Sequence, residues 1–204
     1  MDEDKIERLW EWFSGNERKI KNCIEDERSP GRENIVEQLN NLILDIGLFY
    51  WEIGQGSDNN YYLTISPNGD ADLMAQSISI MESAPDLDGW ELNYCKPSKE
   101  WDRNFKLYDD DMSEQHIDAS NWRCLVTRNA EGTLDLILEA KNIAHLDNFT
   151  TKTAADLVVL NEIGEETKIL TVRSIKTVDQ LDDITESHKM EIKDLRKHFE
   201  ALRT

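Results

Sequence analysis

The stretch "LTISPNGDADL" (residues 63–73) decides how the first half of this chain folds. An apolar run gives way to Pro67–Gly69, where proline fixes φ while asparagine and glycine tolerate the left-handed region. Asp70 then stands where a helix N-cap belongs, and Asp72 favours the first helical turn. The stretch therefore predicts a strand that passes through a tight turn into a helix over about 70–83.

The same turn does not fit a phosphate-binding loop. Such loops carry several glycines followed by Lys and by Ser or Thr, whereas this turn has one glycine and no lysine. The carboxylates of Asp70 and Asp72 would also repel a phosphate from the helix N-terminus. The "GQG" at 54–56 lacks a third glycine and a following helix, so we interpret it as a hairpin loop.

Apolar spacing on both sides of this corner predicts an α+β protein. Upstream, 4–27 and about 32–45 have helical spacing, while 48–54 and 61–66 alternate with period two and predict a β-hairpin. Downstream we expect a strand at 90–97, a hairpin of 122–128 and 133–140, a helix at about 150–163, a strand at 168–176 and a helix at 184–203.

Strand runs joined by tight hairpins, with helices between them, favour an antiparallel or mixed sheet of about five or six strands. We expect helices mainly on one face of that sheet, with two N-terminal helices and one C-terminal helix. A single domain would cover residues 1–180, and residues 181–204 would form a C-terminal amphipathic helix.

The C-terminal helix has two interpretations that the sequence leaves open. Its near-heptad positions are Leu181, Thr185, His188, Ile192, Leu195, Phe199 and Leu202, and basic residues surround them. The helix either packs on its own domain, attracted to the acidic centre, or pairs with a second chain to form a homodimer.

Charge is the strongest functional signal in the sequence. The 204 residues carry a net charge of −19, and no Lys or Arg occurs between Glu33 and Cys95. Such a region repels phosphate backbones and anionic lipids, so we expect no nucleic-acid or membrane binding. A basic protein partner would be attracted to it. The alternative is that the acidity only maintains solubility.

The run "YDDDMSEQHID" (108–118) is the best candidate for a metal site or a partner site. Its oxygen and imidazole ligands would come from Asp109, Asp111, Glu114 and His116, but three adjacent aspartates do not match the alternating spacing of a calcium loop. We therefore favour a solvated acidic loop that meets a basic partner. The expected contact residues are Asp109, Asp110, Asp111 and Glu114, with Trp12 as an aromatic contact.

Other chemistry finds little support in the sequence. There is no HExxH or GxSxG pattern, so we expect no cofactor and no catalytic activity; the alternative is a metal-assisted hydrolase that uses the Asp109–Asp118 carboxylates. Cys23, Cys95 and Cys124 are widely spaced, as buried thiols in a reducing compartment would be. The N-terminus lacks secretory-signal features, so we expect a cytoplasmic protein.

Four segments resemble a bacterial family of uncharacterised proteins: "LWEWF" (9–13), "GLFYWEIG" (47–54), "LTISPNGD" (63–70) and "SAPDLDGWELNYCKP" (83–97). They are similar to that family's Trp-x-Trp-Phe helix, its "LFxEIG" strand, its "TISxxG" corner and its "AP…GW" junction. The resemblance covers about residues 5–100, and the C-terminal helix departs from it. It supports the α+β fold and adds no site. By analogy, some small acidic bacterial proteins are immunity or antitoxin-like, which agrees with a protein-binding role.

Overall fold

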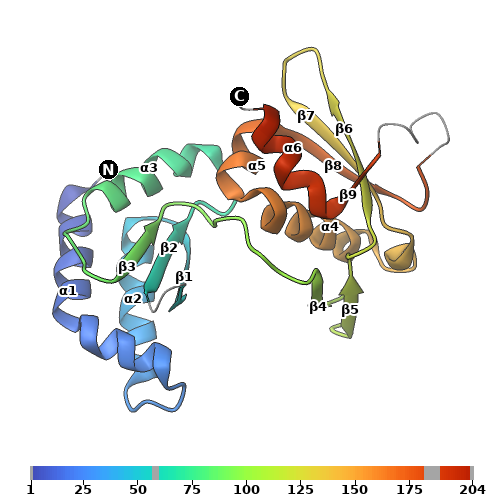
Figure 1. The fold of residues 1–204 in the computed structure, drawn as a ribbon. Helices are drawn as coiled ribbons and strands as arrows, with labels where there is room; N and C mark the ends of the chain where they lie inside the picture. Colours follow the sequence, from blue (N-terminus) through green and yellow to red (C-terminus); the bar gives the residue numbers. More distant parts are fainter. Residues whose placement is uncertain (1, 57–59, 182–188, 203–204) are drawn as a thin grey trace. The chain divides into compact units, whose positions relative to one another are not determined.

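The computed structural model describes residues 2–56, 60–181 and 189–202 (Figure 1). It confirms the α+β class, with helices and with mixed and antiparallel sheets. The chain divides into two compact units, Met1–Lys96 and Pro97–Thr204, rather than into a single domain over 1–180 with a terminal helix. The reason is that each half has enough apolar residues to form a hydrophobic core of its own.

The first unit begins with two helices and continues with a three-stranded sheet. Its elements are α1 (Glu3–Glu25), α2 (Arg32–Ile46), β1 (Tyr50–Gln55), β2 (Tyr61–Ser66), α3 (Ala71–Glu82) and β3 (Trp90–Asn93). The strand order is β1-β2-β3; β1 and β2 form the predicted antiparallel hairpin, whereas β3 pairs with β2 in parallel. Helix α3 is the crossover that makes this parallel pairing possible.

The corner between β2 and α3 has the predicted structure. Asn68 and Gly69 have φ angles of 53° and 81°, in the left-handed region. One carboxylate oxygen of Asp70 accepts the backbone N–H of Asp72 at 2.8 Å and that of Leu73 at 3.4 Å, which caps α3. This turn is therefore a capped corner between a strand and a helix.

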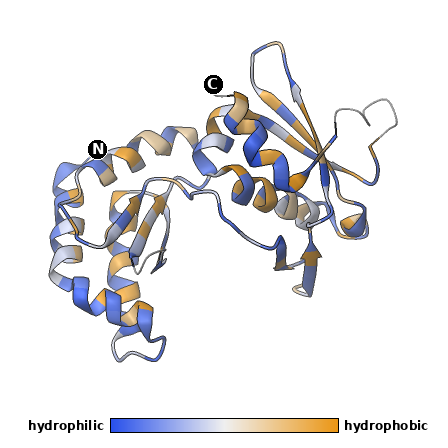
Figure 2. Ribbon diagram, in the orientation of Figure 1, coloured by the Kyte–Doolittle hydropathy of each residue, from blue (hydrophilic) through white to orange (hydrophobic). Residues whose placement is uncertain are grey.

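The core of the first unit lies between the two N-terminal helices and the sheet. Figure 2 shows α1 as largely hydrophilic with isolated hydrophobic positions, which matches its single buried face. Phe13 is fully buried, and its ring meets Trp90 edge to face with 4.8 Å between centroids. The indole Nε1 of Trp10 donates to the carbonyl of Ile80 at 2.9 Å and so connects α1 to α3.

The second unit contains two further sheets. Its elements are β4 (Asn104–Tyr108), β5 (Glu114–Asp118), β6 (Arg123–Arg128), β7 (Leu134–Glu139), η2 (Lys141–Ile143), α4 (Asn148–Ile163), α5 (Glu165–Thr171), β8 (Val172–Val178), β9 (Met190–Glu191), η4 (Ile192–Asp194) and α6 (Leu195–Leu202). Strands β4 and β5 form a separate hairpin, and the other sheet has the order β8-β7-β6-β9. Over the described ranges there are thus nine strands in three sheets, where one sheet of five or six was expected.

Two predicted elements of this unit have different bounds. The strand expected at 168–176 begins only at Val172, because α5 continues the helical path after Gly164. The helix expected at 184–203 is shorter: β9 and the short helix η4 precede α6, which begins at Leu195. Residues 182–188, with Thr185 and His188 of the heptad pattern, lie outside the described residues.

The apolar face of the C-terminal segment packs on its own unit. Leu181, Ile192, Leu195 and Phe199 are buried, and the last three belong to the core formed by β6, β7 and α4. Of the two interpretations, the observed packing is therefore the intramolecular one, and it leaves only Leu202 of this pattern exposed among the described positions.

Candidate functional site

The acidic run 108–118 forms the β4–β5 hairpin, and Asp109 builds its turn. The Asp109 carboxylate accepts the N–H groups of Asp111 at 3.0 Å and Ser113 at 2.8 Å, and also the side-chain amide of Gln115 at 2.7 Å. The backbone closes the same turn, since the Met112 N–H donates to the Asp109 carbonyl at 2.9 Å. Asp109 therefore holds the loop in shape, whereas Asp110 and Asp111 remain exposed.

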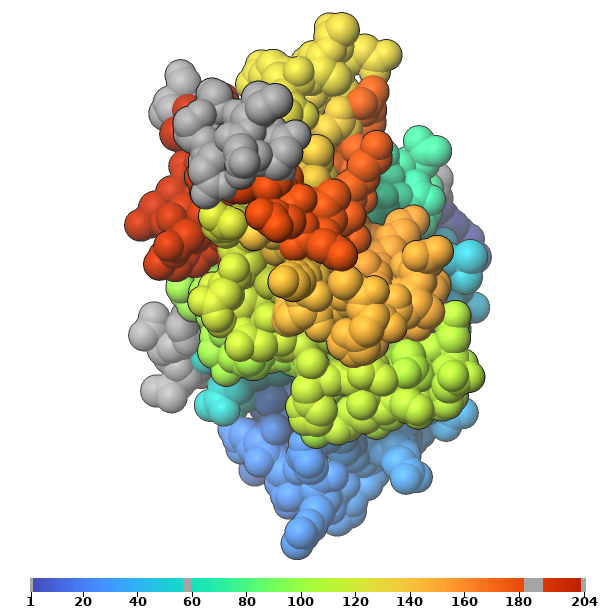
Figure 3. All heavy atoms as spheres, turned by 90° about the vertical axis from the view of Figure 1, so that its right-hand side faces the viewer, coloured from blue at the N-terminus to red at the C-terminus, as the bar shows by residue number. Residues whose placement is uncertain are grey.

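Three large apolar side chains are exposed at this turn or next to it. Tyr108 is 59% exposed, Met112 is 75% exposed, and Phe149, in the first turn of α4, is 65% exposed. The turn and α4 are neighbours, since the backbone N–H of Asp110 lies close enough to the Asp147 carboxylate to help lower its pKa. In Figure 3 the yellow-green β4–β5 segment lies directly beside the orange segment that begins α4. We call the surface formed by Tyr108–Ser113 and Phe149 the acidic tip.

Asp147 fixes the helical side of the acidic tip. Its carboxylate accepts the Thr150 hydroxyl at 2.6 Å and the Thr150 N–H at 2.8 Å, which caps α4. The Thr150 hydroxyl is the largest cause of a lowered pKa of Asp147, followed by the Thr150 N–H, and the N–H groups of Phe149 and Asp110 add to it. The ionised carboxylate thus caps α4 and lies close to the turn.

Glu114 makes a cross-strand contact with Lys106 of β4 and a contact along its own strand with His116. One oxygen of Glu114 accepts Lys106 Nζ at 2.8 Å and lies 3.1 Å from His116 Nε2. The hydrogen bond from Lys106 is the main reason that the pKa of Glu114 is lowered. Over residues 2–56, 60–181 and 189–202, no three His, Cys, Asp or Glu side chains are arranged to hold a metal ion. The geometry gives the hydrolase alternative no support.

Trp12 does not belong to the acidic tip. It lies in the first unit, where its ring packs partly buried against the core and its Nε1 donates to the Gln38 side chain of α2 at 2.6 Å. Trp12 thus connects α1 to α2. At the acidic tip, Tyr108, Met112 and Phe149 provide the apolar surface instead. Sequence reasoning missed this set because Phe149 is separated from the hairpin by the whole of β6 and β7.

A buried ion pair is the most prominent polar cluster of the second unit. Glu162 on α4 is 1% exposed, and its carboxylate accepts Trp101 Nε1 at 2.8 Å and Arg103 Nη2 at 3.0 Å. Arg196 adds a hydrogen bond from its Nε to the Glu162 carbonyl at 3.0 Å. These contacts attach the 99–103 segment to α4 and satisfy the carboxylate, so the cluster is structural.

The three cysteines lie in the interior of the protein. Cys23, Cys95 and Cys124 are all buried free thiols. Burial raises the pKa of the Cys124 thiol to about 12, and the negative charges of Glu162 and Asp194 act in the same direction. A thiol that stays protonated at neutral pH is a poor nucleophile.

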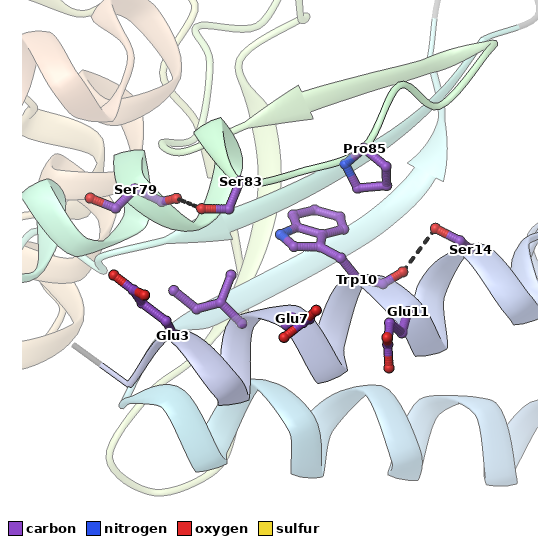
Figure 4. Close-up of a pocket in the computed structure, with 9 residues that line it drawn as sticks. Glu3, Glu7, Trp10, Glu11, Ser14, Ser79, Ser83 and Pro85 are labelled. Carbon is purple, nitrogen blue, oxygen red and sulfur yellow. Dashed lines mark hydrogen bonds between the residues drawn. The ribbon is translucent and has the colours of Figure 1, made fainter.

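An open groove lies between α1 and α3 in the first unit (Figure 4). It has a volume of about 730 Å³. The nearly buried side chains of Ile6 and Trp10 line its apolar part, and three glutamates of α1 border it: Glu3, Glu7 and Glu11. The opposite side carries Ser79, Ser83 and Pro85. The only sequence signal for it was the four-residue spacing of the glutamates, because the groove needs α1 and α3 side by side.

Comparisons of the chain with protein-family models, curated proteins and solved structures give no match. No helix of the described residues combines the length and the apolar character required to cross a membrane.

Proposed function

We propose that this protein is a cytoplasmic, non-enzymatic binding module that recognises a basic protein through the acidic tip. The observation that carries the proposal is the exposure of Tyr108, Met112 and Phe149 beside the carboxylates of Asp110 and Asp111. Aromatic residues and methionine are enriched at protein interfaces, where a few of them supply most of the binding energy. The neighbouring carboxylates attract and orient a positively charged partner.

The backbone conformation of Met112 supports a role for this residue in binding. Its φ angle is 59°, a region that non-glycine residues rarely adopt. Glycine would occupy the position without strain, yet the sequence has a long apolar side chain there and exposes it. A residue whose backbone conformation is unfavourable for its type, and whose side chain is mostly exposed, is a candidate contact residue.

The partner class follows from charge. The protein carries a net charge of −19, so long-range attraction selects basic proteins and repels nucleic acids. A basic toxin that this protein neutralises has this chemistry, in agreement with the immunity-like role suggested by analogy.

Affinity capture from the native cells tests the proposal. The wild-type protein should retain a basic protein that is released by a salt gradient, because the attraction between exposed charges is screened by salt. Reversing Asp110 and Asp111 to lysine should abolish its capture.

The matched control is Glu131→Lys combined with Glu200→Lys, which makes the same change in net charge at exposed positions of the same unit. This control should still capture the protein. Equal capture by both double variants would contradict a role for the acidic tip.

A further inference from the structure

We propose that the groove between α1 and α3 is a second docking site, independent of the acidic tip, and that its occupant is a basic amphipathic helix of a partner protein. That helix would place an apolar face on Ile6 and Trp10 and a row of Lys or Arg residues along the glutamates of α1 (Figure 4).

The apolar part of the groove is suited to a side-chain anchor. Ile6 is 3% exposed and Trp10 is 4% exposed, so both are held by the core and form a rigid floor to the groove. The indole N–H of Trp10 is already bonded to the Ile80 carbonyl, which leaves its ring as the part offered to a ligand. A preformed apolar floor lowers the ordering cost of binding.

The charge along one border is negative and uncompensated. Glu3, Glu7 and Glu11 make no ion pair or hydrogen bond through their side chains with any residue that the structure describes. The two cations that lie between them in the sequence turn the other way: Lys5 bonds to the Asp45 carbonyl at 2.7 Å, and Arg8 lies 3.6 Å from its carboxylate. The opposite wall belongs to the stretch 33–95, which has no Lys or Arg.

The spacing of the glutamates matches a helical ligand. They lie at i, i+4 and i+8 of α1, so they form a row about 12 Å long with a step of about 6 Å. A partner helix that runs along α1 repeats its own Lys or Arg residues with the same step. The row thus spans a little more than two turns of such a helix.

Backbone hydrogen bonding also favours a helix over an extended peptide. Both long walls of the groove are helices, whose backbone N–H and C=O groups are bonded internally. An extended segment would find no strand edge here, and its buried backbone groups would remain unpaired. A helix satisfies its own backbone and brings only side chains to the groove.

The probe for this site is a fluorescent, alanine-based peptide of about 15 residues, long enough to form several helical turns. It carries leucines on one face and three lysines at four-residue spacing beside them. Fluorescence anisotropy with the full-length protein should show saturable binding with a Kd on the order of 10 µM. The same peptide with glutamates in place of the lysines should not bind.

Two protein variants locate the binding. Changing Glu3, Glu7 and Glu11 together to Gln should raise the Kd about tenfold or more. The same change at Glu27, Glu33 and Glu37, exposed carboxylates of the same unit outside the groove, should leave it within about twofold. Ser83→Tyr, which narrows the groove without a change of charge, should weaken binding, whereas Ala71→Tyr on the same helix should not.

The results separate this site from the acidic tip. The variant with Asp110 and Asp111 reversed to lysine should bind the peptide as the wild type does. Absence of saturable binding to the wild type up to about 100 µM, or equal losses in the groove and control triple variants, would overturn the docking site. Neither outcome changes the result that is expected from the capture experiment on the acidic tip.

Discussion

In both units a β-hairpin is followed by a helix and then by a strand that pairs in parallel with the second hairpin strand. The segments are β1-β2-α3-β3 in the first unit and β6-β7-α4-β8 in the second, where α5 precedes β8. The helices differ in how deeply they are covered. Helix α3 fully buries only Ser77 and Ile80, whereas α4 buries residues along its whole length, among them Ala154, Ala155, Val158 and Val159.

The same hairpin–helix–strand connection thus supports a different candidate site in each unit. The short side chains of α4 let it pack closely in the core of the second unit, so its exposed chemistry lies at its first turn, beside the acidic tip. Ser79 of helix α3 and Ser83, which directly follows the helix, border the open groove toward α1. Helix α3, the more exposed of the two, lines the groove. Helix α4, the more buried, supports the acidic tip.

Removal of one large core side chain tests whether the two units have separate cores. Phe13→Ala should destabilise the first unit by about 3–5 kcal/mol, and Leu136→Ala should destabilise the second by about 2–5 kcal/mol, because both side chains are fully buried. Hydrogen exchange should show lost protection in the mutated unit alone. Equal loss of protection in both units would contradict the division at Lys96.

The buried ion pair between Glu162 and Arg103 involves α4, the well-covered helix. Glu162→Leu should destabilise the second unit by about 2–4 kcal/mol, since Arg103 loses its partner in a mostly buried site. Adding Arg103→Met should recover part of that loss. Chemical denaturation measures both effects, and a double variant less stable than Glu162→Leu would contradict this account of the pair.

Helix α3 should depend on its cap, because it has few buried side chains. Asp70→Ala should lower stability by about 1 kcal/mol through loss of the bonds to the N–H groups of Asp72 and Leu73. Asp70→Asn retains an acceptor and should cost less. Thermal unfolding measures the stability of both variants. Equal losses of stability would show that the charge of Asp70 matters more than its hydrogen bonds.

The smallest expected effect is a pH dependence at Glu139 on β7. Burial acts to raise its pKa, but the hydrogen bonds from Arg123 and the Leu181 N–H and the charges of Arg123 and Lys189 lower it below the usual value of 4.5. A lowered folded-state pKa stabilises the protein above pH 4.5, and this stabilisation disappears as the pH falls through the folded-state pKa.

Glu139→Gln should therefore reduce stability at pH 7 and flatten the pH dependence below 4.5. Unfolding measured between pH 3 and 7 tests this. A profile as steep as that of the wild type below pH 4.5 would contradict the role of Glu139.

Local signals in the sequence predicted much of the fold. The corner at 63–73 and the β1–β2 and β6–β7 hairpins follow from turn residues and alternation within a few positions of the sequence. The division at Lys96 and the shortened C-terminal helix depend on contacts between distant residues, such as Ile192 with the core of α4. Helix and strand propensities along the sequence do not reveal such long-range contacts.

The candidate sites were predictable only in part. The run 108–118 identified the acidic half of the tip, but Phe149 enters it through the contact between the turn and α4. Trp12 was a reasonable choice for an exposed aromatic, because it lies off the main apolar face of α1. Its hydrogen bond to Gln38 and its packing against the core come from α2, which a helical pattern taken alone does not include.

The most direct test of the binding function is Met112→Gly at the acidic tip. Glycine adopts a φ of 59° without strain, so the free energy of unfolding should stay the same or rise by about 1 kcal/mol. Capture of the proposed basic partner should nevertheless fall at least tenfold, because the proposal makes this exposed side chain an apolar anchor of the interface. Unchanged capture by a folded Met112→Gly protein would contradict the account.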